Sequence, residues 1–500
     1  MSLKSLLARV YAAHIVRSTR RWSSHPEETQ LRWMLKLVSK ARDTQFGKDH
    51  NFTQIRDYID FKKNIPIRDY EGLRPYIECI KSGKTDVLWP EKPLYFAKTS
   101  GTTSGVKYIP ISRESIQYHI SATRNMLLHY IHHRGNADFV DGKMIFLQGS
   151  PILTETAGIK TGRLSGIVAH YVPGYLQKNR MPTWETNCID DWEEKVDAIV
   201  RETAREDMRL ISGIPPWVQM YFERLLKYTG KSCVSEVFPN FSLLVIGGVS
   251  FEPYKKVFDK LIGKPIDTLE LYPASEGFIA YQDQPDSSGM LLVLDGGIFF
   301  EFIPADAFFE PNPPRYHIGE VKTGVNYVLI LNTNAGLWGY NIGDTIEFVS
   351  TQPPRIRVTG RIKHFISSFG EHVIASEVEY AVQQALKAHG GRINEFTVAP
   401  QVTPPEGGLP YHEWWIEFDE LPEDIEKFSE VLDTSLQQKN VYYRDLIEGK
   451  ILRPAVVRIL PKNTFNLYMK SMGKLGGQNK LPRLSNDRKI ADQLNKMIRA

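Results

Sequence analysis

Apolar residues in the first 360 positions follow two spacings that predict alternating helices and strands. Helical spacing predicts helices over residues 26–42, 53–64, 112–130, 190–205 and 217–228, with Thr53 and Ser112 as N-caps. Short apolar, β-prone runs predict strands at 144–147, 243–246, 268–272, 298–303, 327–331 and 345–349. Because the two kinds of element alternate, we expect a large, layered α/β N-terminal domain over residues 1–360, with β-sheets flanked by helices.

A second pattern begins near residue 360 and predicts a smaller domain over residues 361–500. It opens with a strand at 361–366, a turn at 369–372 and a helix that starts at Ser376, where Glu379 completes a capping box. Strands at 396–402, 412–418 and 455–460 and a helix at 422–437 follow. This β-α-β-β-α-β order indicates a small α+β C-terminal domain built as a two-layer sandwich.

The first twenty-odd residues are basic and amphipathic. Apolar residues that could line one helical face are Leu3, Leu6, Leu7, Val10 and Ile15. The pattern fits a mitochondrial-type presequence, a helix on a membrane surface, or a first helix packed on the domain, and we favour the last. Arg9 and His14 interrupt any apolar run long enough for a secretory signal. No stretch approaches the length of a transmembrane span.

Composition and charge narrow the classes of function. The 500 residues are 42% hydrophobic and 24% charged, as in ordinary globular proteins. With 62 Lys and Arg against 58 Asp and Glu, the net charge of +4 is too balanced to indicate a nucleic-acid surface.

Cysteine and histidine positions give no metal or redox spacing. Cys79, Cys188 and Cys233 are far apart in the sequence, so we expect a reduced, cytoplasmic setting. The pair His132-His133 resembles a metal-binding pair, but it has no nearby acidic or thiol partner. We therefore exclude that pair as a site.

Residues 99–107 read T-S-G-T-T-S-G-V-K and lie between two β-prone segments. Their hydroxyl and backbone N–H donors can surround the oxygens of a polyphosphate. A Walker loop is excluded, because the lysine comes two residues after the glycine and Tyr108 stands at the position of the magnesium-binding hydroxyl. Taken alone, the loop is equally compatible with a polar hairpin turn.

Three further clusters make a nucleotide site the better interpretation. In Y-P-A-S-E-G (272–277), the aromatic ring of Tyr272 can stack on a purine and the carboxylate of Glu276 can hold Mg²⁺. The segment 336–344 ends in Asp344, which can accept hydrogen bonds from both hydroxyls of a ribose. The third cluster, R-V-T-G-R-I-K (357–363), stands at the domain boundary. Each cluster is weak evidence alone, but their joint order is informative.

In this order, the phosphate loop, Y-P-A-S-E-G, G-Y-N-I-G-D and residues 360–379 resemble the adenylate-forming superfamily. That superfamily comprises acyl-CoA synthetases, peptide-synthetase adenylation domains and luciferases. Within it, the chain is similar to the Gretchen Hagen family of acyl-acid amido synthetases, known from auxin-responsive plant enzymes and bacterial relatives, and we expect a bacterial member. F-E-F-I-P (300–304), residues 334–344 and Q-N-K-L-P-R (478–483) are the closer matches, and the resemblance covers nearly the whole chain.

The resemblance implies a role for each matching residue. The β and γ phosphates would be held by Ser100, Gly101, Thr102, Thr103, Ser104 and Lys107. The nucleotide base would be bracketed by Gly247, Gly248, Val249 and Tyr272, with Ala274 and Ser275 beside them. Glu276 would bind magnesium, and Asp344 would bind the ribose. Arg361 would bind the ribose or a phosphate. Lys363 would be the hinge, and Lys480 would contact the substrate carboxylate or the α-phosphate. Glu276, Lys107 and Lys480 are the expected catalytic residues.

Two regions depart from the family or are poorly specified by it. Plant members carry arginines at the positions of Gly339 and Asn341, so any guanidinium contact there is missing. The acyl pocket should draw on the helix after Ser112 and on residues 165–181. Candidates there are Tyr118, Arg124, His170 and Tyr171, each equally compatible with a core or surface position.

The resemblance implies a ligase that uses ATP and Mg²⁺. A small carboxylic acid would attack the α-phosphorus, pyrophosphate would leave, and the amine of an amino acid would then displace AMP from the acyl-adenylate. The first step needs no general base, because the acid is already ionised, and catalysis rests on positioning and charge neutralisation. The C-terminal domain would act as a mobile lid that swings near Lys363 between the two half-reactions.

Two alternatives stay open. An acyl-CoA ligase would share the first half-reaction and form a thioester, although the chain has no carrier-protein domain. A non-catalytic protein that binds a nucleotide or an acyl-adenylate would not need Glu276, Asp344 and Lys480 to be intact. The sequence does not specify the acid, the amino acid, the base for the amine or the oligomeric state.

Overall fold

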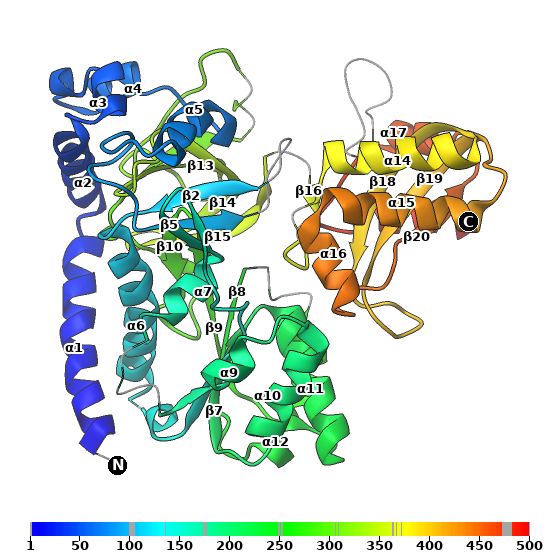
Figure 1. Ribbon diagram of the computed structural model, residues 1–500, viewed down its shortest axis with the longest axis horizontal. Helices are drawn as coiled ribbons and strands as arrows, with labels where there is room; N and C mark the ends of the chain where they lie inside the picture. Colours follow the sequence, from blue (N-terminus) through cyan, green and yellow to red (C-terminus); the bar gives the residue numbers. More distant parts are fainter. Residues whose placement is uncertain are drawn as a thin grey trace. The chain divides into compact units, whose positions relative to one another are not determined.

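The computed structural model divides the chain into two compact units (Figure 1). It describes residues 3–99, 106–135, 137–172, 174, 178–248, 251, 254–305, 307–308, 310–362, 365–366, 368–371, 373–472 and 483–499. The first unit holds the described residues up to Ile362 except Tyr254, and the second holds Tyr254 and the described residues from Phe365 onward.

The five helices predicted by range in the first unit are present in order with shifted ends, together with further short helices that were not predicted. The described helices are α1 (Leu3–Ser23), α2 (Pro26–Ala41), α3 (Gln45–Asp49), α4 (Tyr58–Asn64), α5 (Tyr70–Lys81), α6 (Ser115–Arg134), α7 (Leu164–Ala169), α9 (Trp184–Asn187), α10 (Trp192–Thr203), α11 (Pro215–Thr229), α12 (Val234–Val237) and α13 (Lys255–Ile262). The predicted N-cap Thr53 is wrong. It lies in a short 3₁₀ helix, and the Asp57 carboxylate caps α4 by accepting from the Asp60 N–H at 2.9 Å.

The long helix after Ser112 also differs from its predicted limits. Ser112 Oγ accepts from the Ser115 N–H at 2.9 Å, so Ser112 stands just before α6. The helix continues past residue 130 and ends at Arg134, because the next residue that favours a helix end is Gly135, with a positive φ of 64°.

An eleven-stranded sheet forms the centre of the first unit, in the order β12-β13-β14-β15-β11-β10-β9-β8-β7-β3-β6. Its strands are β3 (Lys143–Phe146), β6 (Arg180–Met181), β7 (Met208–Gly213), β8 (Leu243–Gly247), β9 (Asp267–Ala274), β10 (Gly277–Tyr281), β11 (Met290–Leu292), β12 (Ile298–Pro304), β13 (Asn326–Thr333), β14 (Tyr340–Thr351) and β15 (Pro354–Arg361). Strands β6, β3, β7, β8 and β9 run parallel. β8 is buried along almost its whole length, which explains its continuous apolar sequence.

A second sheet of the first unit frames the predicted phosphate loop. It has four strands in the order β2-β1-β5-β4, namely β1 (Tyr95–Thr99), β2 (Lys107–Ile111), β4 (Thr154–Thr156) and β5 (Ile159–Gly162). Strands β1 and β2 form an antiparallel pair that closes with Thr99 opposite Lys107. The predicted strand on each side of the loop is therefore confirmed.

Helix α1 packs against α6, but its buried face differs from the predicted apolar face. Ala12 is buried in a cluster with Ala122 and Met126 of α6. Leu6, Leu7 and Val10 are instead 51–67% exposed. Small side chains let two helices approach closely, so alanine and not leucine lies at the contact. In the part of the chain that the structure describes, no helix is long and apolar enough to cross a membrane.

Two buried histidines on α6 make the stability of the first unit sensitive to acid. Burial lowers the pKa of His119 to about 4 and, together with nearby cationic groups, that of His129 to about 3, whereas both titrate near 6.5 when unfolded. The unfolded state therefore binds the extra protons as the pH falls below 6.5. We expect the free energy of unfolding to drop by about 3–4 kcal/mol between pH 7 and pH 5.

Urea unfolding followed by circular dichroism at both pH values measures this drop. His119→Leu removes one titrating group, so the variant should lose only about half as much stability between the two pH values. Equal stability of the wild-type protein at pH 7 and pH 5 would show that the histidines are not buried as described.

After its first strand, the predicted elements of the second unit are present in order, together with three helices of the described chain that were not predicted. Its elements are β16 (Phe365–Ile366), β17 (Val373–Ile374), α14 (Ala375–His389), β18 (Arg392–Gln401), β19 (Tyr411–Glu420), α15 (Ile425–Lys439), α16 (Val441–Glu448), β20 (Val456–Leu460), α17 (Thr464–Ser471) and α18 (Lys489–Arg499). The predicted strand at 361–366 is wrong, because Arg361 ends β15 of the first unit and only two residues form β16.

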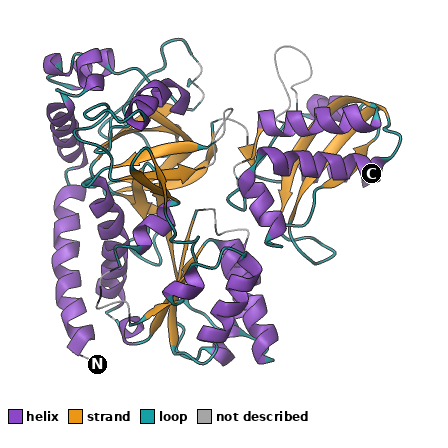
Figure 2. Ribbon diagram, viewed as in Figure 1, coloured by secondary structure: helices purple, strands orange, loops and turns teal. Residues whose placement is uncertain are grey.

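Helices cover both faces of the three-stranded sheet β18-β19-β20, so the predicted two-layer sandwich is corrected to three layers (Figure 2). On one face, Phe418 of β19 packs edge-on against Phe428 of α15. Trp415 points to the other face and packs with Phe465 of α17 and Leu494 of α18. Both faces of β19 are therefore buried, which accounts for its consecutive tryptophans.

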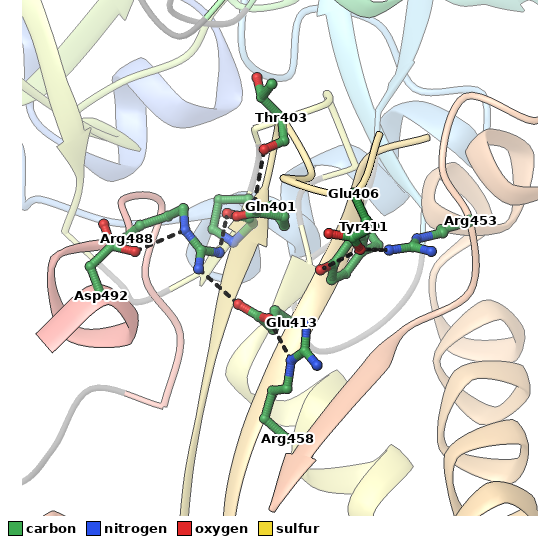
Figure 3. Close-up of polar contacts among 10 residues, drawn as sticks. Gln401, Thr403, Glu406, Tyr411, Glu413, Arg453, Arg458, Arg488 and Asp492 are labelled. Carbon is green, nitrogen blue, oxygen red and sulfur yellow. Dashed lines mark hydrogen bonds and ion pairs between the residues drawn. The ribbon is translucent and has the colours of Figure 1, made fainter. Parts of the chain in front are cut away.

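A buried carboxylate fixes the start of α18 to this sheet (Figure 3). Glu413 of β19 is 4% exposed and accepts from Arg458 at 2.9 Å and from Arg488 at 2.8 Å. Arg488 also donates to the Pro400 carbonyl at 3.1 Å and pairs with Asp492. These contacts anchor the chain that follows residues 473–482, which lie outside the described residues.

Candidate functional site

Several predicted site residues lie outside the described residues. They are Ser100, Gly101, Thr102, Thr103, Ser104, Val249, Lys363 and Lys480. Lys107 is described and begins β2, with its ammonium 5.8 Å from the centre of the Tyr70 ring. Lys107 thus lies directly after the predicted phosphate loop, and its binding role stays a prediction.

The Y-P-A-S-E-G segment forms a tight hairpin between β9 and β10. Ala274 pairs with Gly277, which leaves Ser275 and Glu276 as the two turn residues. A Cβ at Gly277 would lie 2.4 Å from the terminal methyl of Ile298, so a larger residue here would force that side chain to shift. The hairpin presents the partly exposed Glu276 carboxylate at the end of the sheet.

The G-Y-N-I-G-D segment begins β14, and contacts with the protein core fix its backbone. Trp338 is fully buried and donates to the Leu88 carbonyl at 3.1 Å. Gly339 has a φ of 56°, and a Cβ there would lie 2.3 Å from the Pro66 oxygen. The local backbone therefore excludes any side chain at this position, which explains why the chain has no arginine there.

The two segments are joined by a crossed pair of tyrosine–carboxylate hydrogen bonds. Tyr272 of the first segment donates to Asp344 of the second, and Tyr340 of the second donates to Glu276 of the first at 3.2 Å. Each segment thus positions the carboxylate of the other.

This contact requires the large sheet to coil. Strands β9 and β14 are four places apart in the sheet order, which would separate them by about 19 Å in a flat sheet. A tyrosine and an aspartate cannot bridge that gap, so the strands between them must curve. Coiling therefore brings together two carboxylates that are far apart in the sequence.

Neighbouring strands add three more predicted residues. Asp344 is 6% exposed and lies opposite Arg361 in the antiparallel pairing of β14 with β15. Gly247 ends β8 opposite Leu271, directly before Tyr272, and Gly248 follows with a φ of 86°. The backbone thus places these residues on strands that adjoin the crossed pair, while their binding roles stay predictions.

A buried polar network holds the backbone of the G-Y-N-I-G-D segment, and the sequence did not predict this role. Glu301 of β12 is fully buried and accepts from Arg315 at 3.0 and 2.8 Å and from Asn332 at 3.0 Å. Asn332 in turn accepts from the Gly339 N–H at 2.6 Å. A charged residue inside the apolar strand F-E-F-I-P was the sequence signal for this network.

The four acyl-pocket candidates separate into two groups. Tyr118 and Arg124 line a cavity of about 190 Å³ beside α1, and Tyr118 packs edge-on against Trp33. His170 bonds to the Pro151 carbonyl at 2.8 Å, and Tyr171 donates to the Tyr95 hydroxyl of β1 at 3.0 Å. The contacts thus place only Tyr171 against a strand that frames the phosphate loop.

Comparisons with known proteins agree with the fold. An indole-3-acetic acid-amido synthetase, GH3.3 of Arabidopsis thaliana, is 20% identical, and the match covers 92% of this chain and 90% of the relative. The structure of the GH3.15 acyl acid amido synthetase superposes with a TM-score of 0.62 at 16% identity, covering 97% of this chain and 96% of that one. That of a 2-hydroxyisobutyryl-CoA ligase gives 0.58 at 13% identity, with 95% and 93% covered. The predicted fold class is therefore confirmed.

Family models match most of the chain in order. The GH3 family N-terminal domain matches residues 16–193, the central domain 291–361 and the C-terminal domain 376–489. The central match contains the second segment with Tyr340 and Asp344, and ends at Arg361. The chain therefore belongs to the GH3 family, the Gretchen Hagen family that its motifs resemble.

Proposed function

We propose that this protein is an acyl-acid amido synthetase that uses ATP and Mg²⁺ to join a small carboxylic acid to an amino acid. Its GH3 family membership supports the proposal, since the relative matched over nine-tenths of its length is named an amido synthetase. The crossed tyrosine–carboxylate pair carries the proposal, because it ties together two carboxylates that could bind a metal ion and accept from a ribose.

The two carboxylates suit different parts of the nucleotide. Glu276 offers partly exposed carboxylate oxygens, the hard ligands that Mg²⁺ prefers. Magnesium bound there would neutralise charge on the phosphates. Asp344 is nearly buried and accepts from Tyr272, so a ribose hydroxyl would join or replace that donor.

The other residues hold the substrates in place. We assign the phosphates to Ser100, Gly101, Thr102, Thr103, Ser104 and Lys107, and the base to Gly247, Gly248, Val249, Tyr272, Ala274 and Ser275. Because the attacking carboxylate is already ionised, adenylation needs no proton transfer, and fixed positions of these donors supply most of the catalysis. The amine of the acceptor must arrive neutral for the second step.

We assign ATP and acyl-acid binding to residues 1–360 and the role of a lid to residues 361–500. Lys363 would be the hinge, and the lid would bring Lys480 to the reacting carboxylate. Arg361 ends the last strand before this hinge and would contact ribose or phosphate. Three free cysteines fit a cytoplasmic setting.

The acceptor distinguishes this function from that of an acyl-CoA ligase with the same fold. The purified protein is incubated with ATP, Mg²⁺, a panel of carboxylic acids and either mixed amino acids or coenzyme A, and the products are identified by mass spectrometry. We expect AMP and an N-acyl amino acid in equal amounts. An acyl thioester formed with coenzyme A and no amide would contradict the proposal.

A further inference from the structure

Helix α6 carries two histidines on one face that meet an aspartate from a distant part of the chain. His129 and His133 are four residues apart, so their side chains lie one above the other. Asp283 follows β10, and one ligand atom from each of the three residues lies within 4.8 Å of the others. The pair that shares a face is thus His129 with His133, and not the adjacent His132 with His133 considered in the sequence.

The buried ring of His129 is available as a ligand. Its Nε2 bonds to the Thr19 hydroxyl at 3.0 Å, and its Nδ1 has no hydrogen-bond partner in the described part of the chain. The side chain is only 2% exposed, so water does not readily satisfy that nitrogen. When Thr19 accepts the Nε2 proton, Nδ1 carries a buried lone pair. Leaving a buried lone pair without a partner is unfavourable, and a bound cation would satisfy it.

Arg355 prepares the carboxylate of Asp283. Its guanidinium donates to both oxygens, at 2.9 and 2.7 Å, and the aspartate is 5% exposed. Carboxylates that bind metals are commonly oriented by such a second partner. Arg355 also adds positive charge beside the cluster, so we expect a moderate affinity for a cation and not the tightest class.

We propose that His129, His133 and Asp283 bind a first-row divalent ion of the Zn²⁺ type. Two imidazoles and one carboxylate suit zinc, cobalt or nickel and not magnesium, and a water molecule would complete a four-coordinate site. Ligand atoms in such a site lie about 3.3 Å apart, so the cluster must contract on binding. His133 is exposed and supplies that movement. The ion would tie α6 to the end of β10 and, through Arg355, to β15.

This site is independent of the proposed ligase activity, because it uses neither Glu276 nor Asp344. The test is titration of the chelator-treated protein with Co²⁺, followed by visible absorption, and with Zn²⁺, followed by calorimetry. We expect one equivalent to bind and Zn²⁺ to raise the thermal midpoint. His133→Ala should weaken binding at least about tenfold, and the exposed position makes this variant safe for folding.

His132→Ala is the matched control, since it removes the neighbouring histidine of the same helix and should bind as the wild type does. Failure of the wild-type protein to bind micromolar Co²⁺ or Zn²⁺ would overturn the proposal. So would unchanged affinity in His133→Ala, or an equal loss in both variants, which would indicate binding to surface histidines in general.

Discussion

Replacing Glu276 by glutamine should lower carboxylate-dependent exchange of pyrophosphate into ATP by about 100-fold or more, with the fold intact. The substitution keeps the size of the side chain and removes the charge that we assign to the magnesium ion. The hairpin turn is held by the Ala274–Gly277 pairing, which does not depend on the Glu276 charge. We therefore expect circular dichroism and the thermal midpoint to stay close to the wild-type values.

An exposed carboxylate elsewhere on the first unit provides the control. Glu223→Gln on α11 also removes one negative charge, and it should leave exchange within about twofold of the wild-type rate, because screened surface charges act weakly over distance. Tyr340→Phe removes the donor to Glu276 and should give an intermediate loss. Wild-type exchange in Glu276→Gln would show that this carboxylate does not bind the metal ion.

Replacing Glu301 by alanine should destabilise the first unit by about 3–5 kcal/mol. The change leaves the guanidinium of Arg315, whose side chain is 10% exposed, without its carboxylate inside the core. Burial of an unpaired charge is one of the few single changes with an effect of this size. Tyr58 also donates to Glu301, at 3.1 Å, and would lose that acceptor.

Loss of Glu301 should also disturb the geometry of the candidate site. The amide nitrogen of Asn332 would lose one of its two acceptors, and the oxygen of the same amide accepts from the Gly339 N–H before Tyr340. We therefore expect a higher KM for ATP in any Glu301→Ala protein that folds. Chemical denaturation measures the stability change, and exchange at varied ATP concentration measures the KM.

A partly exposed ion pair in the same unit supplies the comparison. Glu71 and Arg74 on α5 pair at 2.9 Å with side chains 34% and 39% exposed, and Glu71→Ala should cost less than about 1 kcal/mol. If Glu301→Ala costs no more than Glu71→Ala, the buried network does not support the site as described.

Local sequence patterns predicted the segments of the site but not how they meet. The turn at Ser275–Glu276 and the strands beside the phosphate loop follow from glycine positions and short apolar runs, which act over a few residues. The crossed bonds of Tyr272 and Tyr340 depend on the coiling of a sheet whose strands come from distant parts of the chain. No local spacing carries that information.

The errors have the same physical origin. Thr53 precedes an apolar run, which is the pattern of an N-cap, but the Asp57 carboxylate is the stronger acceptor for a helix N-terminus. Strand β15 was not predicted, and only the tertiary fold reveals that its Arg355 pairs with Asp283. Asp283 is also the acidic neighbour of His133, and it comes from a distant part of the chain, so no local spacing indicates it.

The measurement that tests the central claim most directly is incorporation of labelled pyrophosphate into ATP by the purified protein. The account predicts exchange that requires Mg²⁺ and at least one member of a broad panel of small carboxylic acids, and that is absent without an acid. No acid-dependent exchange with any member of the panel, in a protein that binds ATP, would contradict it and indicate a nucleotide-binding protein without ligase activity.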